Sequence, residues 1–186
     1  VCSSDLVLGP RAIPRLGELI AQIEREKKRS VETSLDLEEI FEVEPYHETG
    51  KVSAFVSVQQ GCNKMCTYCI VPVVRGREVN RPLRDILTET ENLVKKGVRE
   101  VTLIGQTVNS WKEKSYKFGD LLRKVAEIRE LDRIRFTTSY PRDVTKRMIY
   151  AMSQEPKVCH HVHLPVQSGS NRVLAMMKRT YTKIGR

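Results

Sequence analysis

Apolar residues recur along the chain with two spacings, one typical of helices and one typical of strands. Apolar positions 13, 16, 19, 20 and 23 follow helical spacing, which predicts an amphipathic helix over residues 13–26, after a strand that ends at Leu8. Residues 27–50 are rich in charge, carry few apolar anchors and show no clear period, so we expect an extended linker there.

From Lys51 onward, short β-type runs alternate with helical patterns. We expect strands over 54–58, 101–104, 134–138 and 159–164. We expect one helix that begins at Pro82 and ends before Gly97, and further helices over 118–128, 143–153 and 170–178. Strand–helix repeats of this length indicate βαβ units around a parallel sheet. The predicted fold class is α/β, a partial parallel (βα) barrel with about four units, where a closed or partly closed barrel has roughly six to eight.

Composition and charge narrow the class of protein. Charged residues make up 30% of the 186 residues and hydrophobic ones 40%, which fits a soluble globular protein. No apolar run approaches the roughly 20 residues of a spanning helix, so we expect a cytoplasmic protein without a membrane partner. The net charge of +9 is unevenly divided, because residues 1–50 hold 6 Lys and Arg against 11 Asp and Glu, whereas residues 51–186 hold 26 against 12. The basic part predicts a polyanionic partner.

Both ends of the sequence match translated sequencing adapters. Residues 1–6 can be back-translated as GTG TGC TCT TCC GAT CT, and residues 184–186 as ATC GGA AGA. We therefore expect both tips to be non-biological and leave them out of fold reasoning. Excluding Cys2 lowers the number of relevant cysteines from five to four.

Three of these cysteines fall in one short loop after the strand at 54–58. Cys62, Cys66 and Cys69 have the spacing Cys-x3-Cys-x2-Cys, which suits a soft metal. A zinc site usually needs a fourth Cys or His close by, and none follows in the loop. Disulfides are disfavoured because the loop holds three cysteines, an odd number, in a cytosolic-looking chain. A 4Fe–4S cluster with three cysteine ligands would leave one iron open for a substrate or cofactor.

Cys159, His160, His161 and His163 form a second group of metal-ligand residue types. Neighbouring residues of a strand point to opposite faces, so His160 and His161 cannot share one inward site. We interpret this group as the fourth strand rather than as a metal site.

The cysteine loop, with its aromatic residue before the third cysteine, resembles the radical S-adenosylmethionine superfamily. That resemblance implies that Cys62, Cys66 and Cys69 bind a 4Fe–4S cluster whose open iron chelates S-adenosylmethionine. One-electron reduction would then cleave S-adenosylmethionine to a 5′-deoxyadenosyl radical, with flavodoxin or ferredoxin as the electron donor.

Further stretches resemble the methylthiotransferase branch of this superfamily, in particular the members that modify N6-isopentenyladenosine in tRNA. The resemblance spans residues 7–183 and is carried by 71–78, 105–111, 135–141, 163–170 and 177–182. Thr107, Trp111 and Tyr140 depart from the residues that are usual in that branch. The resemblance implies a monomer that methylthiolates C2 of the prenylated adenosine beside the anticodon. Alternatives are a methylthiotransferase for threonylcarbamoyladenosine or a ribosomal protein, and a non-catalytic, basic RNA-binding module with a structural metal.

The same resemblance implies the domain organisation. Residues 1–26 would be the tail of an N-terminal domain whose own cysteines hold a second 4Fe–4S cluster, 27–50 a linker, and 51–186 a truncated barrel. The fragment alone is not expected to perform the full reaction.

Candidate site residues outside the cysteines are four polar residues at strand ends, one aromatic residue and four arginines. At or just beyond the carboxyl ends of strands, where parallel barrels carry their chemistry, Gln106, Asn109, Ser139 and Gln167 are candidates to hydrogen-bond S-adenosylmethionine or the target base, or else to cap loops. Tyr68 is a candidate to pack against the adenine, or against the loop. Four arginines lie around the cysteine loop in the sequence: Arg75, Arg77, Arg81 and Arg84. We expect them either to contact tRNA phosphates or to form ion pairs with Glu78 and Asp85.

Overall fold

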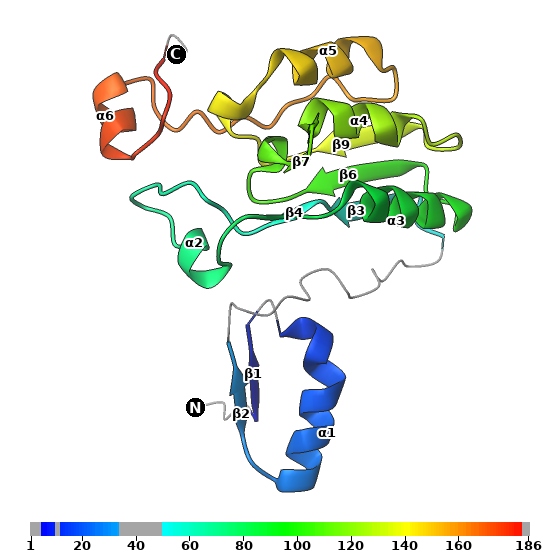
Figure 1. Ribbon diagram of the computed structural model, residues 1–186, viewed down its shortest axis with the longest axis vertical. Helices are drawn as coiled ribbons and strands as arrows, with labels where there is room; N and C mark the ends of the chain where they lie inside the picture. The colour runs from blue at the N-terminus through cyan, green and yellow to red at the C-terminus, as the bar shows by residue number, and fades with distance from the viewer. Residues whose placement is uncertain (1–4, 10–11, 34–49, 184–186) are drawn as a thin grey trace.

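The computed structural model describes residues 5–9, 12–33 and 50–183 (Figure 1). The two proposed adapter tips therefore lie almost wholly outside the described residues. Asp5 and Leu6 are described, but they interact through backbone atoms, as any residue could. In the described ranges, no helix has the length and apolar character needed to cross a membrane.

The N-terminal part forms one βαβ unit. Its elements are β1 (Leu6–Leu8), the 3-10 helix η1 (Ile13–Arg15), α1 (Leu16–Glu26) and β2 (Ser30–Glu32). The predicted first helix is confirmed, and it ends where Lys27 adopts a left-handed φ of 53°. β1 and β2 pair in parallel, with Leu6 opposite Ser30. Within the stretch expected to be a linker, residues 30–32 form a strand, which the sequence did not reveal because three residues with one apolar side chain, Val31, are too short to show alternation. Residues 34–49 lie outside the described residues.

The second part alternates strands and helices as the hydrophobic pattern predicts. Its elements are β3 (Ser53–Ser57), β4 (Gln59–Gln60), α2 (Val71–Val74), β5 (Val79–Asn80), α3 (Leu83–Lys95), β6 (Glu100–Ile104), η2 (Val108–Ser110), β7 (Lys112–Glu113), β8 (Tyr116–Lys117), α4 (Phe118–Ala126), β9 (Arg133–Phe136), η3 (Pro141–Asp143), α5 (Lys146–Gln154) and α6 (Asn171–Met176). Pro82 occupies the N-cap position of α3 rather than its first helical residue.

A parallel sheet in the order β3-β6-β9 is the frame of this part. Val56 lies opposite Leu103, and Leu103 opposite Phe136. Helix α3 connects β3 to β6, and α4 connects β6 to β9, so the βαβ prediction is confirmed. The described residues form three strands of such a sheet and not a closed barrel.

The predicted fourth strand at 159–164 is absent from the described elements. A single parallel bridge joins Ile134 to Val158, and Cys159 donates its N–H to the carbonyl of Ile134. Further along, Ser139 donates its N–H to the carbonyl of His163 at 3.2 Å. Among the described residues, this segment therefore lies beside β9 with isolated hydrogen bonds and without a continuous ladder.

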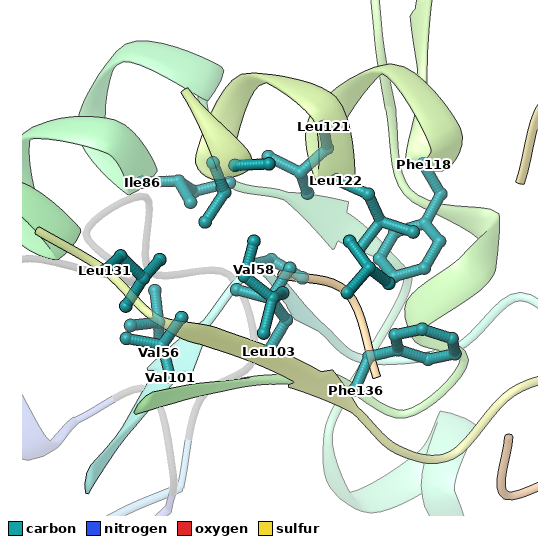
Figure 2. Close-up of a cluster of buried hydrophobic side chains, with 14 of the residues drawn as sticks. Val56, Val58, Ile86, Val101, Leu103, Phe118, Leu121, Leu122, Leu131 and Phe136 are labelled. Carbon is teal, nitrogen blue, oxygen red and sulfur yellow. The ribbon is translucent and has the colours of Figure 1, made fainter. Parts of the chain in front are cut away.

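The hydrophobic core lies between the sheet and its covering helices (Figure 2). Alternate strand residues face the helices because successive side chains of a strand point to opposite faces. Val56, Leu103 and Ile134 are fully buried on this face, and Phe55 on the other face is 68% exposed. The ring of Phe118 from α4 meets Phe136 of β9 edge to face, with centroids 5.2 Å apart. Each such side chain stabilises the fold by about 1.5–3 kcal/mol through burial.

The sheet brings three loops to one edge, because the strands are parallel. The loops after β3, β6 and β9 all leave from carboxyl ends, and α2 and α6 lie at the same end of the molecule (Figure 1). The cysteines and the predicted rim residues are therefore gathered at this edge.

Candidate functional site

The cysteine loop is closed at its base by a short antiparallel pair. Gln59 and Gln60 of β4 pair with Asn80 and Val79 of β5. Just inside this base, Gly61 has a φ of 74°, and a Cβ atom there would collide with the carbonyl oxygen of Arg77. Only glycine suits both conditions. The N–H of Cys62 donates to the carbonyl of Gly76 at 3.2 Å, so the first cysteine is fixed to the far side of the loop.

All three loop cysteines are free thiols. Cys62 and Cys66 are buried, and Cys69 is half-buried. The N–H of Cys69 donates to the carbonyl of Cys66 at 3.1 Å, which folds the second half of the loop into a turn. Over residues 5–9, 12–33 and 50–183, no three His, Cys, Asp or Glu side chains lie close enough to hold a metal ion. The thiols share one loop but would have to turn toward a common point to act as ligands.

The environment of Cys62 favours its protonated form. Burial raises the pKa of the Cys62 thiol, while hydrogen bonds from the backbone of Lys64 and from Thr107 act in the lowering direction. Metal binding needs the thiolate, so ligation at Cys62 must displace a proton that the folded loop retains.

A buried polar network supports the loop from below, and the sequence analysis did not identify it. Gln59 is 1% exposed, and its amide donates to Asn80 and Ser110 at 3.3 and 3.2 Å. Its Oε1 accepts from the N–H of Thr107 at 2.9 Å. The network joins the base of the cysteine loop to the loop after β6. One signal was available, since a glutamine just after an apolar strand must find partners when it is buried.

Asn109 holds two rim loops together rather than facing a cofactor. It is 5% exposed, its Nδ2 donates to the carbonyl of Tyr140 at 2.9 Å, and its Oδ1 accepts from the N–H of Tyr140 at 2.7 Å. This side chain therefore pairs with the backbone as a neighbouring strand would. Of the two roles considered from the sequence, loop capping is the one that this geometry supports.

Gln106 and Ser139 differ from Asn109 because each has a buried polar atom without a hydrogen-bond partner among the described residues. The atoms are the Oε1 of Gln106 and the Oγ of Ser139. Ser139 is 1% exposed and follows Thr138, whose left-handed φ is uncommon for a β-branched residue. Buried unpaired polar atoms and strained backbone gather at functional sites.

A cavity of about 440 Å³ opens beside these residues. Its lining includes Ser57, Gly105, Gln106 and Thr138 at the carboxyl ends of β3, β6 and β9, together with Gln60 of β4 and Ile13 and Pro14 of η1. Gln167 does not line it; it is exposed in the loop before α6, with a left-handed φ of 67°. The structure thus brings Gln106 and the segment of Ser139 together and leaves Gln167 outside.

An aromatic and cationic cluster lies against the other side of the cysteine loop. Tyr140 is 3% exposed, with the Nζ of Lys64 at 4.7 Å and the Cζ of Arg179 at 4.5 Å from its ring centroid. Lys64 also forms an ion pair with Asp143. Tyr68 is 53% exposed on the loop, and its hydroxyl accepts from Arg179 at 3.5 Å. Chain spacing gives no sign that Arg179 reaches this loop.

The four arginines near the loop do not form one group. Arg75, Arg77 and Arg84 are exposed, whereas Arg81 forms a largely buried ion pair with Glu89 and donates to the carbonyl of Ser57. The burial of Arg81 disfavours a phosphate contact, and its partner Glu89 is neither of the two acidic residues expected from the sequence.

The donor set of the loop fits an iron–sulfur cluster. Thiolates are the usual protein ligands of such clusters, and this loop supplies three. The unpaired Oε1 of Gln106 and Oγ of Ser139 are suited to a polar organic cofactor at the same edge.

Comparison with known proteins agrees with this chemistry. The family model of the Radical SAM superfamily matches residues 56–183. The chain is 47% identical over 183 residues to the tRNA-2-methylthio-N(6)-dimethylallyladenosine synthase of Syntrophus aciditrophicus, an overlap of 96% of this chain and 40% of that protein. It is 48% identical over 185 residues to the protein of the same name from Nitrosomonas eutropha, covering 97% and 42%. The chain thus spans about two fifths of the length of these curated relatives.

Solved structures resemble the chain in fold. The radical S-adenosylmethionine methyltransferase TsrM from Kitasatospora setae, with cobalamin and a [4Fe-4S] cluster bound, matches with a TM-score of 0.55 and 19% identity over 71% of this chain and 25% of that one. The cobalamin-dependent enzyme OxsB matches with a TM-score of 0.51 and 13% identity, covering 70% and 20%. At these identities the likeness concerns the fold alone.

Proposed function

The chain belongs to the radical SAM superfamily, and from that premise we propose that it is the cluster-binding part of a tRNA methylthiotransferase. The intact protein would attach a methylthio group to C2 of N6-isopentenyladenosine beside the anticodon. The observation that carries the proposal is the loop with three free cysteines at the carboxyl edge of the parallel sheet. The names of its relatives in Syntrophus and Nitrosomonas support the choice of substrate.

Cys62, Cys66 and Cys69 would hold a 4Fe–4S cluster. When bound, the cluster supplies the electron for reductive cleavage of S-adenosylmethionine, the chemistry that the superfamily shares. The chain's own contribution is to fix the loop at Gly61 and at the β4–β5 pair, and to release the Cys62 proton on ligation.

Gln106 and Ser139 would hydrogen-bond S-adenosylmethionine, because their buried polar atoms have no other described partner. Tyr68 would pack near the adenine, and Gln167 would contact the cofactor or base from the loop before α6. Asn109 is not included, since its amide is already paired with Tyr140.

Exposed cations near the loop would bind the RNA. Arg75, Arg77 and Arg84 are accessible for phosphate contacts, which supply salt-dependent affinity. The described sheet would be part of a parallel (βα) barrel, and the N-terminal βαβ unit part of a domain with a second 4Fe–4S cluster. A cytoplasmic monomer that receives electrons from flavodoxin or ferredoxin completes the proposal.

Anaerobic reconstitution with iron and sulfide tests the cluster. The wild-type chain should become brown, bind iron and sulfide, and cleave S-adenosylmethionine when reduced. Cys66→Ala should lose the cluster, because two ligands would remain. Cys159→Ala is the matched control, since this free cysteine lies outside the loop, and it should keep wild-type iron content.

A contrary result is equally specific. A colourless wild-type protein that retains stoichiometric zinc would support a structural metal without catalysis. Wild-type iron content in Cys66→Ala would refute the ligand assignment.

A further inference from the structure

Arg179, just beyond α6, reaches back to the cysteine loop. Its Nη1 donates to the Sγ of Cys66 at 3.1 Å, across 113 residues of sequence. Its Nε donates to the hydroxyl of Tyr181 at 3.0 Å, and its Nη2 to the carbonyl of Pro165 at 3.3 Å. The guanidinium is therefore held at each of its nitrogens, and this places it beside the Cys66 sulfur.

The backbone around Arg179 is tied to the same loop. Thr67, the residue after Cys66, donates its N–H to the carbonyl of Met177 at 3.3 Å and its hydroxyl to the carbonyl of Met176 at 3.1 Å. The N–H of Arg179 donates to the carbonyl of Leu174 at 2.8 Å, which fixes the residue to the end of α6. The end of α6 is thus hydrogen-bonded to the middle of the cysteine loop.

The positive charge of Arg179, unlike that of the neighbouring Lys64, is not compensated by a carboxylate among the described residues. Lys64 is paired with the carboxylate of Asp143 at 2.5 Å, so its charge is compensated. Among the described residues, the partners of the Arg179 guanidinium are a thiol, two phenol oxygens and a carbonyl oxygen. Its positive charge is therefore available to the sulfur of Cys66.

We propose that Arg179 is a positioning residue for the cluster ligand Cys66: it orients the Cys66 sulfur and raises the reduction potential of the bound cluster. This inference rests on the proposed function, which makes Cys66 a ligand. Hydrogen bonds to ligand sulfurs and nearby positive charge both stabilise the more negative, reduced state of a cluster. A planar fork of donors can bond Cys66, Pro165 and Tyr181 at once, whereas the single ammonium of a lysine cannot.

The test compares Arg179→Gln, Arg179→Lys and the control Arg172→Gln in the reconstituted chain. Arg172 is an exposed arginine in α6, so its replacement removes the same charge close to the same helix. In an EPR-monitored redox titration, we expect a lower midpoint potential in Arg179→Gln, an intermediate one in Arg179→Lys, and the wild-type value in Arg172→Gln. Resonance Raman bands of the Fe–S(Cys) stretches should shift in Arg179→Gln alone.

A second measurement needs no cluster. The alkylation rate of each cysteine in the apo-protein is followed by mass spectrometry up to the high-pH plateau, where every thiol is ionised and the rate reports access. We expect a rise of about threefold or more at Cys66 in Arg179→Gln, because the guanidinium no longer covers the sulfur, and no change at Cys159. Melting temperatures show whether each variant is folded.

The outcomes separate this inference from the proposed function. A cluster with the same midpoint potential in wild type and Arg179→Gln would overturn the inference and leave the proposed function intact. An unchanged plateau rate at Cys66 would also overturn it, independently of any cluster. A wild-type chain that binds no iron would overturn both.

Discussion

Asn109 and Ser139 lie at the same edge of the sheet and are both almost fully buried, yet their hydrogen bonding is opposite. Asn109 uses both ends of its amide on the backbone of Tyr140, whereas the Oγ of Ser139 has no partner among the described residues. Burying an unpaired hydroxyl destabilises the folded chain, so the presence of Ser139 at this position is not explained by stability. The contrast separates a residue that joins two rim loops from one whose hydroxyl we propose to bind a ligand.

We predict that Asn109→Ala lowers the stability of the chain, whereas Ser139→Ala leaves stability intact and weakens cofactor binding. Ser139→Ala should leave the free energy of unfolding unchanged or slightly raised, because no bond is lost, and should weaken S-adenosylmethionine binding to the reconstituted protein. Asn109→Ala should lower the free energy of unfolding by about 1–3 kcal/mol, because it leaves the N–H of Tyr140 unpaired and removes one of the two hydrogen bonds to its carbonyl, which also accepts from the N–H of Asp143. Urea unfolding and equilibrium dialysis measure the two quantities. Equal loss of stability in both variants would contradict the assignment.

A pH dependence follows from the buried thiol of Cys62. Its pKa is raised by burial, so the folded apo-protein binds the thiol proton more tightly than the unfolded chain does. The stability from this group is complete below the pKa of the unfolded thiol and is lost as the pH rises through the higher pKa of the folded state.

The measurement is the unfolding free energy of the apo-protein across the alkaline range, in wild type and in Cys62→Ser. The wild type should lose more stability than Cys62→Ser in this range, since serine does not titrate. In parallel, alkylation of Cys62 should set in at higher pH in the folded chain than in the chain unfolded by urea. Identical alkylation profiles of Cys62 in the folded and in the urea-unfolded chain would refute the raised pKa of this thiol.

The cysteine loop as an element depends on one glycine. We predict that Gly61→Ala prevents cluster assembly, because its Cβ would meet the carbonyl of Arg77 in a backbone conformation with positive φ. Gly97→Ala is the control: Gly97 has a φ of 98°, and its Cβ would meet no atom within 4 Å. Gly97→Ala should cost about 1–2 kcal/mol from the left-handed conformation alone, and Gly61→Ala about 1–3 kcal/mol more from the collision. Iron content after reconstitution and urea unfolding test both, and equal costs would contradict this account.

The helices and the three central strands could be predicted because each one carries its own hydrophobic period. The prediction failed where an element depends on a distant partner. β2 is a strand because β1 lies beside it, and residues 159–164 form none of the named strands because, among the described residues, one bridge and isolated hydrogen bonds join this segment to β9. A local pattern contains neither fact.

The sequence singles out the three candidate cysteines, but it does not reveal the residues that support their loop. The spacing of Cys62, Cys66 and Cys69 is visible in the sequence. The contacts of Gln59 with Thr107 and of Arg179 with Cys66 span 48 and 113 residues, so the sequence gives no sign of them. The sequence predicts a rim position for Asn109 and offers loop capping as one of its roles, but it does not reveal the partner Tyr140, which lies 31 residues away.

At the scale of the whole molecule, not every basic residue of the chain is available at the surface. Arg81 forms an ion pair with Glu89 inside the fold, so the number of basic residues overstates the number of cations that a polyanion can contact. We predict that Arg75→Gln and Arg77→Gln each weaken binding to an anticodon stem-loop RNA and reduce the slope of log K against log salt by about 0.7–0.9.

Arg129→Gln is the control for these two variants, since Arg129 is exposed between α4 and β9, toward the amino-terminal edge of the sheet. Fluorescence anisotropy over a series of salt concentrations measures the slope. A slope reduced equally by Arg129→Gln would mean that the charge acts diffusely and not from the loop edge.

The antiparallel pair of β4 and β5 has a consequence for how this fold can change over time. It joins the two ends of the cysteine loop side by side, so the loop enters and leaves the scaffold at one point. A segment with adjoining ends can be lengthened, shortened or exchanged without shifting the strands and helices that flank it. Outside its cysteines, Gly61 and the contacts of Thr67 with the end of α6, the cysteine loop can therefore change in sequence or length while the sheet stays the same.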